Sequence, residues 1–490
     1  MAGRDARAAR HRFMRAGAAL LALLCLGGFA LMPSSSAAFT AIAGGPASSF
    51  TARATFGLSQ TAGCFSDNGT GGCTTAAGIT DDTSVVVSPD GKHVYVGSVA
   101  KGAVSAYTRN ATTGALTQLT SPTGCYSNAS VPGCTTVLGV MGALFDLTVS
   151  PDGKHLYAVG YSTHTIAAFS RNATTGALTP LASPNKCLYD NSLSSPPSGC
   201  ASAYKIMGAD GIAISPDGAY VYVVSVQSNS LTVFSRNATT GVLTQLSGTA
   251  GCYTNSTTSG CTTASGLGSP FAVRTSPDGT SVYVASNLSN AVAVFQRNMT
   301  TGVLSQPAPP NSCVYNNGST AIPNCTAVRG LSGAYNVGIA PDGATVYAVG
   351  NAGNAVASFT RNTTTGVLTQ VAAPNACIYH NSSTAITGCT AARAISSPTS
   401  ITFSPDGMFA FVAASVSQGV AVFRHNSSTG VLTQLSTTSG CIALSSTTGC
   451  TTGVGLGTAT GIAVSPDGRD VYAVGGGGSR GYIAVLNFTH

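Results

Sequence analysis

One repeated phrase constrains the fold of this chain more than any other feature. The triplet Pro-Asp-Gly occurs seven times, and successive copies are separated by 62, 65, 61, 64, 64 and 61 residues. A second phrase, close to Arg-Asn-Ala-Thr-Thr-Gly, recurs six times between them, first at Arg109 and last, in looser form, around Asn426. A repeat of this length and regularity indicates either a solenoid or a propeller.

The content of one repeat favours the propeller. In the unit around Pro216, residues 210–215 (DGIAIS) and 219–225 (AYVYVVS) predict two strands on either side of a turn. The turn itself is Ser-Pro-Asp-Gly, in which Pro presets φ and Gly accepts a left-handed conformation. Residues 231–237 (LTVFSRN) and 242–248 (VLTQLSG) predict two further strands joined by a hairpin. Four antiparallel strands per repeat are typical of a propeller blade.

The two ends of the chain explain why there are seven turns and only six hairpins. Residues 481–490 match the third strand of a repeat and stop where the hairpin would follow, while residues 51–64 match a fourth strand. We therefore expect one blade to combine three C-terminal strands with one N-terminal strand. Such a closure pairs the sheet edges that would otherwise be exposed. The predicted fold is an all-β, seven-bladed propeller in a single domain, residues 39–490.

Residues 1–38 have the pattern of a secretory signal peptide. A basic start containing five arginines is followed by an apolar run, residues 16–32, and by small residues, 34–38. The leader carries five Arg and one Asp, a charge of +4, so removing it reduces the net charge from +7 to +3. Dispersed arginines on a nearly neutral chain give no electrostatic case for nucleic acid binding. No later segment approaches about 20 uninterrupted apolar residues, so we expect no membrane span after signal removal.

The cysteines follow the repeat. Apart from Cys25 in the leader, fourteen cysteines form seven local couples, each between the fourth strand of one blade and the first strand of the next. Local pairing gives one disulfide per blade, and each closed loop of roughly ten residues contributes about 2.5–3 kcal/mol in the chain-entropy model. Disulfides and the leader both indicate a secreted protein, extracellular or in the cell envelope, and we expect a monomer. The expected pairs are Cys64–Cys73, Cys125–Cys134, Cys187–Cys200, Cys252–Cys261, Cys313–Cys325, Cys377–Cys389 and Cys441–Cys450.

The repeat "SPDGxxxYV…AVxxFxRNxTTGVLTQL" resembles the seven-bladed lactonase-like propellers, which include the 6-phosphogluconolactonase and carboxymuconate cyclase types and are related to YVTN-like surface propellers. The resemblance covers nearly all of the chain after the leader and implies a site at one mouth of the central channel, built from His, Glu and Arg. This chain departs from that pattern. Its first strands do not begin with Pro-His, and its fifteen acidic residues are all aspartate. No catalytic residue is therefore transferred from the family.

Candidate site residues come instead from loops expected at the channel mouth. Carboxylates opposite cations could orient and polarise a lactone carbonyl, with an Asp assisting water, although such residues also commonly solvate loops. We expect no metal, because the cysteine spacing lacks C-x-x-C and no histidine accompanies it, and we expect no cofactor. The catalytic candidates are Asp82, Asp146, Asp210 and His164, and the ligand-binding candidates are Lys205, Arg329, Arg393, Tyr335 and Asn336.

Two functions remain open from the sequence. The first is a secreted binding or scaffold propeller without catalysis, with a small molecule, a glycan or a protein at the channel mouth. The absence of glutamate, the low charge and the near-identical blades favour it. The second is a lactone hydrolase of the 6-phosphogluconolactonase type, using Asp82, Asp146 or Asp210 with Lys205 or Arg329. The fold alone does not decide between them.

Overall fold

The computed structural model describes residues 56–137, 140–445, 447, 449–476 and 480–489, together with two short strands before them. The chain divides into two units, Met1–Thr55 and Phe56–His490. In the first unit, β1 (Ala38–Thr40) pairs antiparallel with β2 (Ser49–Thr51). Apart from Ala38, the predicted signal peptide lies outside the described residues. Within the described part of the chain, no helix is long and apolar enough to cross a membrane.

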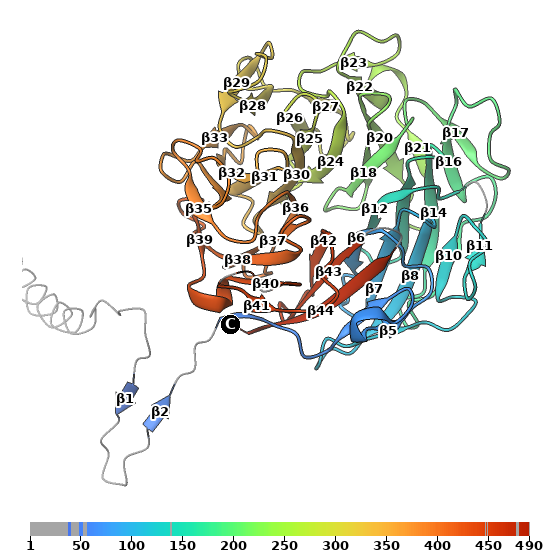
Figure 1. Ribbon diagram of the computed structural model, residues 1–490. Coiled ribbons are helices and arrows are strands. Elements are labelled where there is room, and N and C mark those ends of the chain that lie inside the picture. The colour runs from blue at the N-terminus through green and yellow to red at the C-terminus, as the bar shows by residue number, and fades with distance from the viewer. Residues whose placement is uncertain are drawn as a thin grey trace, which may run out of the picture. The chain divides into compact units, whose positions relative to one another are not determined.

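The second unit consists of seven sheets of six strands each, arranged as blades of a propeller. In Figure 1 the colours run round a ring from blue to red, and the first strand of each blade lies nearest the centre. The first strands are β6 (Asp82–Val87), β12 (Leu144–Val149), β18 (Ala209–Ile214), β24 (Pro270–Thr275), β30 (Ala334–Ile339), β36 (Pro398–Phe403) and β42 (Ala459–Val464). Blades one to seven are numbered in this order, which confirms the predicted number of blades.

The second and third strands continue each blade outward as an antiparallel meander. The second strands are β7 (His93–Ser98), β13 (His155–Gly160), β19 (Tyr220–Ser225), β25 (Ser281–Ser286), β31 (Thr345–Gly350), β37 (Phe409–Ala414) and β43 (Asp470–Gly476). The third strands are β8 (Ala103–Arg109), β14 (Thr165–Arg171), β20 (Ser230–Arg236), β26 (Ala291–Arg297), β32 (Ala355–Arg361), β38 (Gly419–His425) and β44 (Gly481–Thr489).

The fourth position of each blade holds two short strands, which pair with opposite halves of the third strand. The first pieces are β9 (Leu116–Gln118), β15 (Leu178–Pro180), β21 (Leu243–Gln245), β27 (Leu304–Ser305), β33 (Leu368–Gln370), β39 (Leu432–Gln434) and β3 (Gly57–Ser59). The second pieces, which begin at a cysteine, are β10 (Cys125–Ser127), β16 (Cys187–Asp190), β22 (Cys252–Thr254), β28 (Cys313–Asn316), β34 (Cys377–His380), β40 (Cys441–Ala443) and β4 (Cys64–Ser66).

A last short strand in each blade runs parallel to the cysteine strand, an element that the sequence reading did not anticipate. These strands are β11 (Thr135–Thr136), β17 (Ala201–Ala203), β23 (Thr262–Thr263), β29 (Cys325–Val328), β35 (Thr390–Ala392), β41 (Thr451–Thr452) and β5 (Thr74–Thr75). Three 3-10 turns, η1 (Thr70–Gly72), η2 (Gly248–Gly251) and η3 (Thr437–Gly440), lie beside them.

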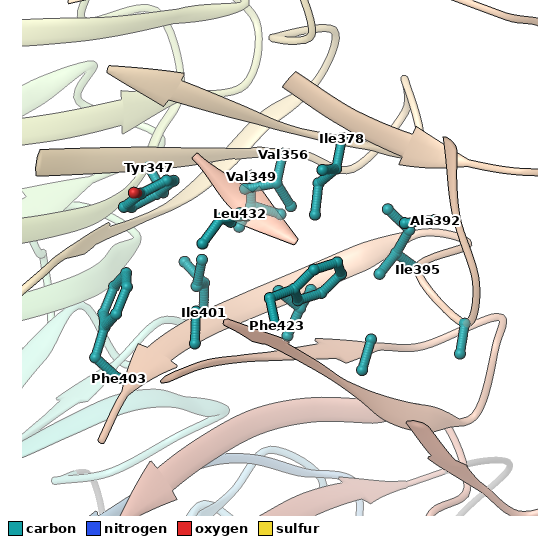
Figure 2. Packing of buried hydrophobic residues seen from close by; sticks show 14 of the residues in the cluster. Tyr347, Val349, Val356, Ile378, Ala392, Ile395, Ile401, Phe403, Phe423 and Leu432 are labelled. Carbon is teal, nitrogen blue, oxygen red and sulfur yellow. The ribbon is translucent and has the colours of Figure 1, made fainter. Parts of the chain in front are cut away.

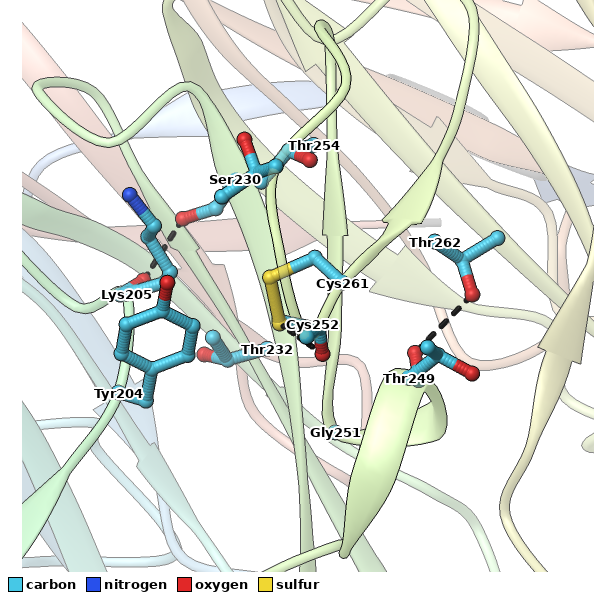
Figure 3. The surroundings of a disulfide bond; sticks show 12 residues. Tyr204, Lys205, Ser230, Thr232, Thr249, Gly251, Cys252, Thr254, Cys261 and Thr262 are labelled. Atoms are coloured by element: carbon cyan, nitrogen blue, oxygen red, sulfur yellow. Dashed lines mark hydrogen bonds between the residues drawn. A yellow bond between two sulfur atoms is a disulfide. The ribbon is translucent and has the colours of Figure 1, made fainter.

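All seven predicted disulfides are present, one per blade. In blade three, Cys252 begins β22 and Cys261 immediately precedes β23, so the bond joins the two arms of a loop whose strands run parallel (Figure 3). The disulfides therefore add a covalent constraint to the short parallel ladders that hold these loops.

Blade seven confirms the predicted closure. The C-terminal strand β44 pairs with the N-terminal strands β3 and β4, with Leu58 opposite Phe488 and Cys64 opposite Ala484. Figure 1 accordingly shows the red β44 beside the blue β5. Because β44 also pairs with β43, both edges of the last strand are covered and the ring has no open end.

The core lies between neighbouring blades rather than inside any one of them. Figure 2 shows the contact between blades five and six, where Tyr347 and Val349 of one blade face Phe403 and Ile401 of the next. Each such cluster is built from alternating apolar positions of the first, second and third strands of two neighbouring blades. The tyrosine at the position of Tyr347 is fully buried in six of the blades.

Arginines at the ends of the third strands join neighbouring blades. Their side chains are at most 2% exposed, and each contacts an aspartate of the preceding blade. Five of the seven blade contacts carry such a pair. The arginines are Arg109, Arg171, Arg236, Arg297 and Arg361.

The contact between blades six and seven uses aromatic packing instead. Phe488 occupies the arginine position of β44, and its ring centroid lies 4.9 Å from those of Phe409 and Phe411. Phe411 replaces the tyrosine whose hydroxyl, in the other blades, donates to a hairpin carbonyl such as that of Gly176. Blade seven has no hairpin to accept this bond, so a phenyl ring avoids leaving a buried hydroxyl without a partner. Phe56, 5.5 Å from Phe409, packs beside the same cluster.

Candidate functional site

A cavity of 330 Å³ lies in the central channel, and its walls come from all seven first strands. This is within the size range of small-molecule sites. Most of the lining consists of short apolar and hydroxyl side chains. The charged and amide groups come from four consecutive blades, two to five: Asp146, Asp210, Arg274 and Asn336.

A β-bulge near the start of every first strand determines which residues reach the channel. In blade two the register shifts between Leu144 and Asp146, so Phe145 and Asp146 together oppose a single residue of β13. A bulge re-aims the side chains next to it. Residues at the second and third positions of the strands accordingly line the cavity, whereas the first position is buried between the strands.

Asp146 is held in place by donors from three blades. Its Oδ1 accepts hydrogen bonds from the Ser84 hydroxyl, at 2.8 Å, and from its neighbour's amide, Leu147, at 2.9 Å. Its Oδ2 accepts the amide of Ile212 at 3.2 Å and lies 3.5 Å from Nη1 of Arg274. Both oxygens of this carboxylate therefore accept a hydrogen bond from the protein.

Arg274 is the cation of the channel. Its side chain is 34% exposed, and Nη1 also donates to the Val273 carbonyl at 2.8 Å. The fifth position of a first strand faces the same way as the third, because side chains alternate along a strand. Arg274 in blade four therefore faces the channel, as Asp146 in blade two does, and the two side chains approach each other there.

Asp210 is in a different environment from Asp146. The residue is only 6% exposed, and burial, reinforced by the nearby Asp146 carboxylate, raises the pKa of Asp210 well above its usual value. Burial also raises the pKa of Tyr335, and the neighbouring Asp210 carboxyl adds to this effect. The two carboxyl groups of the channel are therefore in different environments, and burial favours the neutral form of Asp210.

Comparison with known proteins supports the same architecture. Residues 378–488 match the family model described as a seven-bladed β-propeller lactonase. The chain is a seven-bladed propeller that resembles the lactonase family over these residues. A search of curated proteins finds no match.

Several solved structures have a similar trace over most of their length. The periplasmic gluconolactonase of Pseudomonas aeruginosa is 17% identical over 72% of this chain and 83% of its own, with a TM-score of 0.48. A Bacteroides fragilis protein, provisionally assigned as a 6-phosphogluconolactonase, is 20% identical over 72% of this chain and 82% of its own, with a TM-score of 0.49. A protein from Lactobacillus plantarum is 16% identical over 74% and 86% of the two chains, with a TM-score of 0.49.

The lactonase-like propeller brings four of the nine candidate residues to the cavity: Asp146, Asp210, Tyr335 and Asn336. Asn336 lies at the third position of β30, where its side-chain oxygen accepts the amide of Val337 at 2.8 Å. Asp82 does not line the cavity. It is 1% exposed at the first position of β6, and its Oδ1 accepts the amide of Thr80 at 3.1 Å.

His164 has a contact that explains its position. It adopts a positive φ of 54° in the turn between β13 and β14, and its Nδ1 accepts the amide of Gly208 at 2.9 Å. Asn229 occupies the same turn in the next blade and accepts the amide of Ser269 through its side-chain oxygen, at 2.7 Å. His164 therefore performs the loop-tying role that asparagine has in the neighbouring blade.

The three basic candidates lie away from the cavity, over the outer strands. The ammonium of Lys205 lies 5.4 Å from the Tyr204 ring centroid, beside the loop drawn in Figure 3. The backbone amide of Arg329 donates to the side chain of Gln370 at 3.0 Å. The guanidinium of Arg393 donates to the carbonyls of a neighbouring disulfide loop, Leu435, Thr437 and Gly449.

Sequence reasoning named Tyr335 but missed Arg274, Phe145 and Phe271. Phe145, Phe271 and Tyr335 share the second position of their strands with Asp210, and all line the cavity. Alternation from the third-position aspartate could have identified the fifth-position arginine. Among the described residues, no group of three or more His, Cys, Asp or Glu side chains is placed to hold a metal ion.

Proposed function

We propose that this lactonase-like propeller is a secreted binding protein that takes a small polar molecule into its channel without transforming it. The observation that carries the proposal is the variation of the channel positions. The third positions of the first strands hold Ser84, Asp146, Gly211, Ala272, Asn336, Ser400 and Gly461. The other parts of the blades have nearly identical sequences, whereas these positions differ from blade to blade. The lining of the channel is therefore asymmetric, as a specific binding site requires.

The state of the two carboxyl groups supports binding over catalysis. Asp146 accepts three hydrogen bonds and lies 3.5 Å from Arg274, so little lone-pair capacity is left for water. No histidine is among the residues that line the cavity, and the chain contains no glutamate. A general base must reach its proton within hydrogen-bonding distance, and protein donors already occupy the carboxylate oxygens of Asp146.

One observation favours lactone hydrolysis as the second candidate. The raised pKa of Asp210 places a carboxyl group with some basicity in the same cavity as Arg274, and residues 378–488 match a lactonase model. In that mechanism Asp210 would assist the attacking water and Arg274 would stabilise the negative charge that develops on the carbonyl oxygen. Arg274 would then take the place that the sequence suggested for Lys205 or Arg329.

Secretion is supported by the seven disulfides, since such bonds persist in oxidising compartments. Sequencing the N-terminus of protein recovered outside the cytoplasm tests this part of the proposal. Cleavage near residue 38 is the expected result. Protein retained in the cytoplasm with free thiols would refute it.

The functional test measures binding and turnover on the same samples. Oxidised protein is titrated with a panel of lactones and their hydroxy acids by calorimetry, while acid release is followed in a pH-stat. The variants are Asp146→Asn and Asp210→Asn, with Asp342→Asn in an outer turn as the matched control. Binding without turnover, lost in the channel variants only, supports the proposal. Turnover that both channel variants abolish would establish the hydrolase. An affinity that is unchanged in both variants would show that the channel is not the binding site.

A further inference from the structure

Asp210 lacks a partner. It lines the cavity and is 6% exposed, yet its carboxyl group forms no hydrogen bond or ion pair with any residue that the structure describes. Buried carboxyl groups are normally paired, because burying a polar group without a hydrogen bond costs free energy. The group faces a cavity large enough for a small molecule. The missing partner is therefore expected to come from a ligand.

Aromatic residues line the same cavity as Asp210 and come from the neighbouring blades. Phe145 and Phe271 hold the same strand position in the two neighbouring blades, and Tyr335 holds it in the blade beyond. The ring centroids of Phe271 and Tyr335 lie 5.2 Å apart, and Phe145 packs against Tyr161 at 5.3 Å. The faces of such rings attract positive charge. A carboxyl group between aromatic rings is suited to an organic cation.

The charges of the cavity lead to the same ligand. Arg274 and three hydrogen-bond donors already compensate Asp146, so Asp210 is the acidic group of the lining that lacks a counter-charge. An anionic ligand would supply no counter-charge to the Asp210 carboxyl group. A neutral ligand would leave the Asp210 carboxyl without a charge partner. A protonated amine would supply both N–H donors and positive charge.

We propose that the ligand of the channel carries a primary or secondary ammonium group, which binds Asp210 as its counter-ion and packs against Phe145, Phe271 and Tyr335. This inference rests on the proposed binding function and specifies the ligand class. It also predicts a proton effect. Burial raises the pKa of Asp210 and so favours its protonated form in the empty channel, whereas an ammonium group would stabilise its carboxylate. Binding is therefore expected to release the carboxyl proton to the buffer as the N–H···O contact forms.

Three probes of similar size and different charge test the ligand class: benzylamine, benzyl alcohol and benzoate. Calorimetric titration of the oxidised protein at pH 7 should show binding of benzylamine, with benzyl alcohol about tenfold weaker or more and benzoate weaker still. Repeating the benzylamine titration in buffers of different ionisation enthalpy should show release of about one proton per molecule bound. Asp210→Asn should remove both the affinity and the proton release, and Asp342→Asn should change neither.

The outcomes separate this inference from the function on which it rests. If benzyl alcohol or a lactone binds as well as benzylamine, and Asp146→Asn abolishes that binding, the channel is a site but the ammonium ligand is refuted. If benzylamine binds without proton release and Asp210→Asn leaves its affinity unchanged, the ammonium ligand is again refuted. If no probe or lactone binds, both proposals fail. Thermal unfolding of each variant confirms that the propeller is intact.

Discussion

The guanidinium of Arg171 in blade two binds the turn of blade one: its Nη2 donates hydrogen bonds to both carboxylate oxygens of Asp90, at 2.9 and 2.8 Å. Its Nε donates to the Tyr95 hydroxyl of the same neighbouring blade at 2.9 Å, and Nη1 donates to the Gly153 carbonyl of its own turn at 2.9 Å. One buried side chain thus joins two successive repeats and satisfies its own donors. The neighbouring blades repeat this arrangement with small variations.

Replacing Arg171 with Met should destabilise the propeller by about 3 kcal/mol, because breaking a buried pair leaves groups without their partners. Asp90 is 29% exposed and can recover some hydration, which keeps the loss at the lower end of the range for buried pairs. Denaturant unfolding of the oxidised protein measures the change. Arg469→Ala, in an exposed turn position, is the control and should change stability by less than about 0.5 kcal/mol. Equal losses of stability for the two variants would contradict a role of Arg171 in joining the two blades.

Acid should weaken the same contacts. Burial alone would raise the pKa of Asp90, but hydrogen bonds from Ser88 and Arg171 outweigh it and lower the pKa to about 2. The unfolded chain binds this proton near pH 3.8, whereas the folded chain binds it near pH 2. The contribution is therefore complete above about pH 4 and is lost as the pH falls towards 2. The melting temperature should drop across this window in the native protein, and less steeply in Asp90→Asn. Parallel curves for the two proteins would count against this origin.

Asp82 should reduce stability at neutral pH. Its Oδ2 is buried without a partner, and the equivalent residues Leu144, Ala209 and Ala459 are apolar. Burial raises the pKa of Asp82, so above about pH 4 the unfolded chain loses a proton that the folded chain keeps, and stability falls as the pH rises. Asp82→Ala should therefore be more stable at pH 7 by about 1–3 kcal/mol, measured by denaturant unfolding. The gain should shrink towards pH 4. A loss of stability at pH 7 would show that Asp82 has a partner in solution.

Each disulfide should contribute independently. Changing both Cys252 and Cys261 to Ser opens a loop with a sequence separation of 9, which should cost about 2.5 kcal/mol in the chain-entropy model. The same change at Cys441 and Cys450, also separated by 9, should cost a similar amount. The combined variant should show the sum of the two losses, since distant sites are additive. Losses that exceed the sum would indicate that the loops of separate blades cooperate.

The sequence was sufficient for the ring because its information is repeated. Seven turns at nearly constant spacing predict the blades, and the unmatched strand at each end predicts that β44 pairs with β3 and β4. The cysteine couples recur with the blades, so their pairing could be predicted as well. The parallel strands after the cysteines were not predicted, because they are two to four residues long and lack a periodic pattern.

The site was harder to predict, for a local reason. Asp82, Asp146 and Asp210 all stand near the start of a first strand, and the sequence gives no sign that the bulge places them at the first, third and second positions respectively. A shift of one residue moves a side chain to another face of the strand. The burial of Arg171 was not predicted either, because an arginine at a strand end next to a turn ordinarily has an exposed side chain.

The pairing of Gly57 with Thr489 brings the first and last strands of the propeller to the place where every other blade has a hairpin. A short Asn-Ala-Thr-Thr-Gly linker of the kind found at Asn110 could join them and make a covalently continuous circle. New termini could then be opened at any of the six natural hairpins. The order in which the blades are translated is therefore dispensable for the architecture, and circular permutants of residues 56–489 should assemble the same wheel.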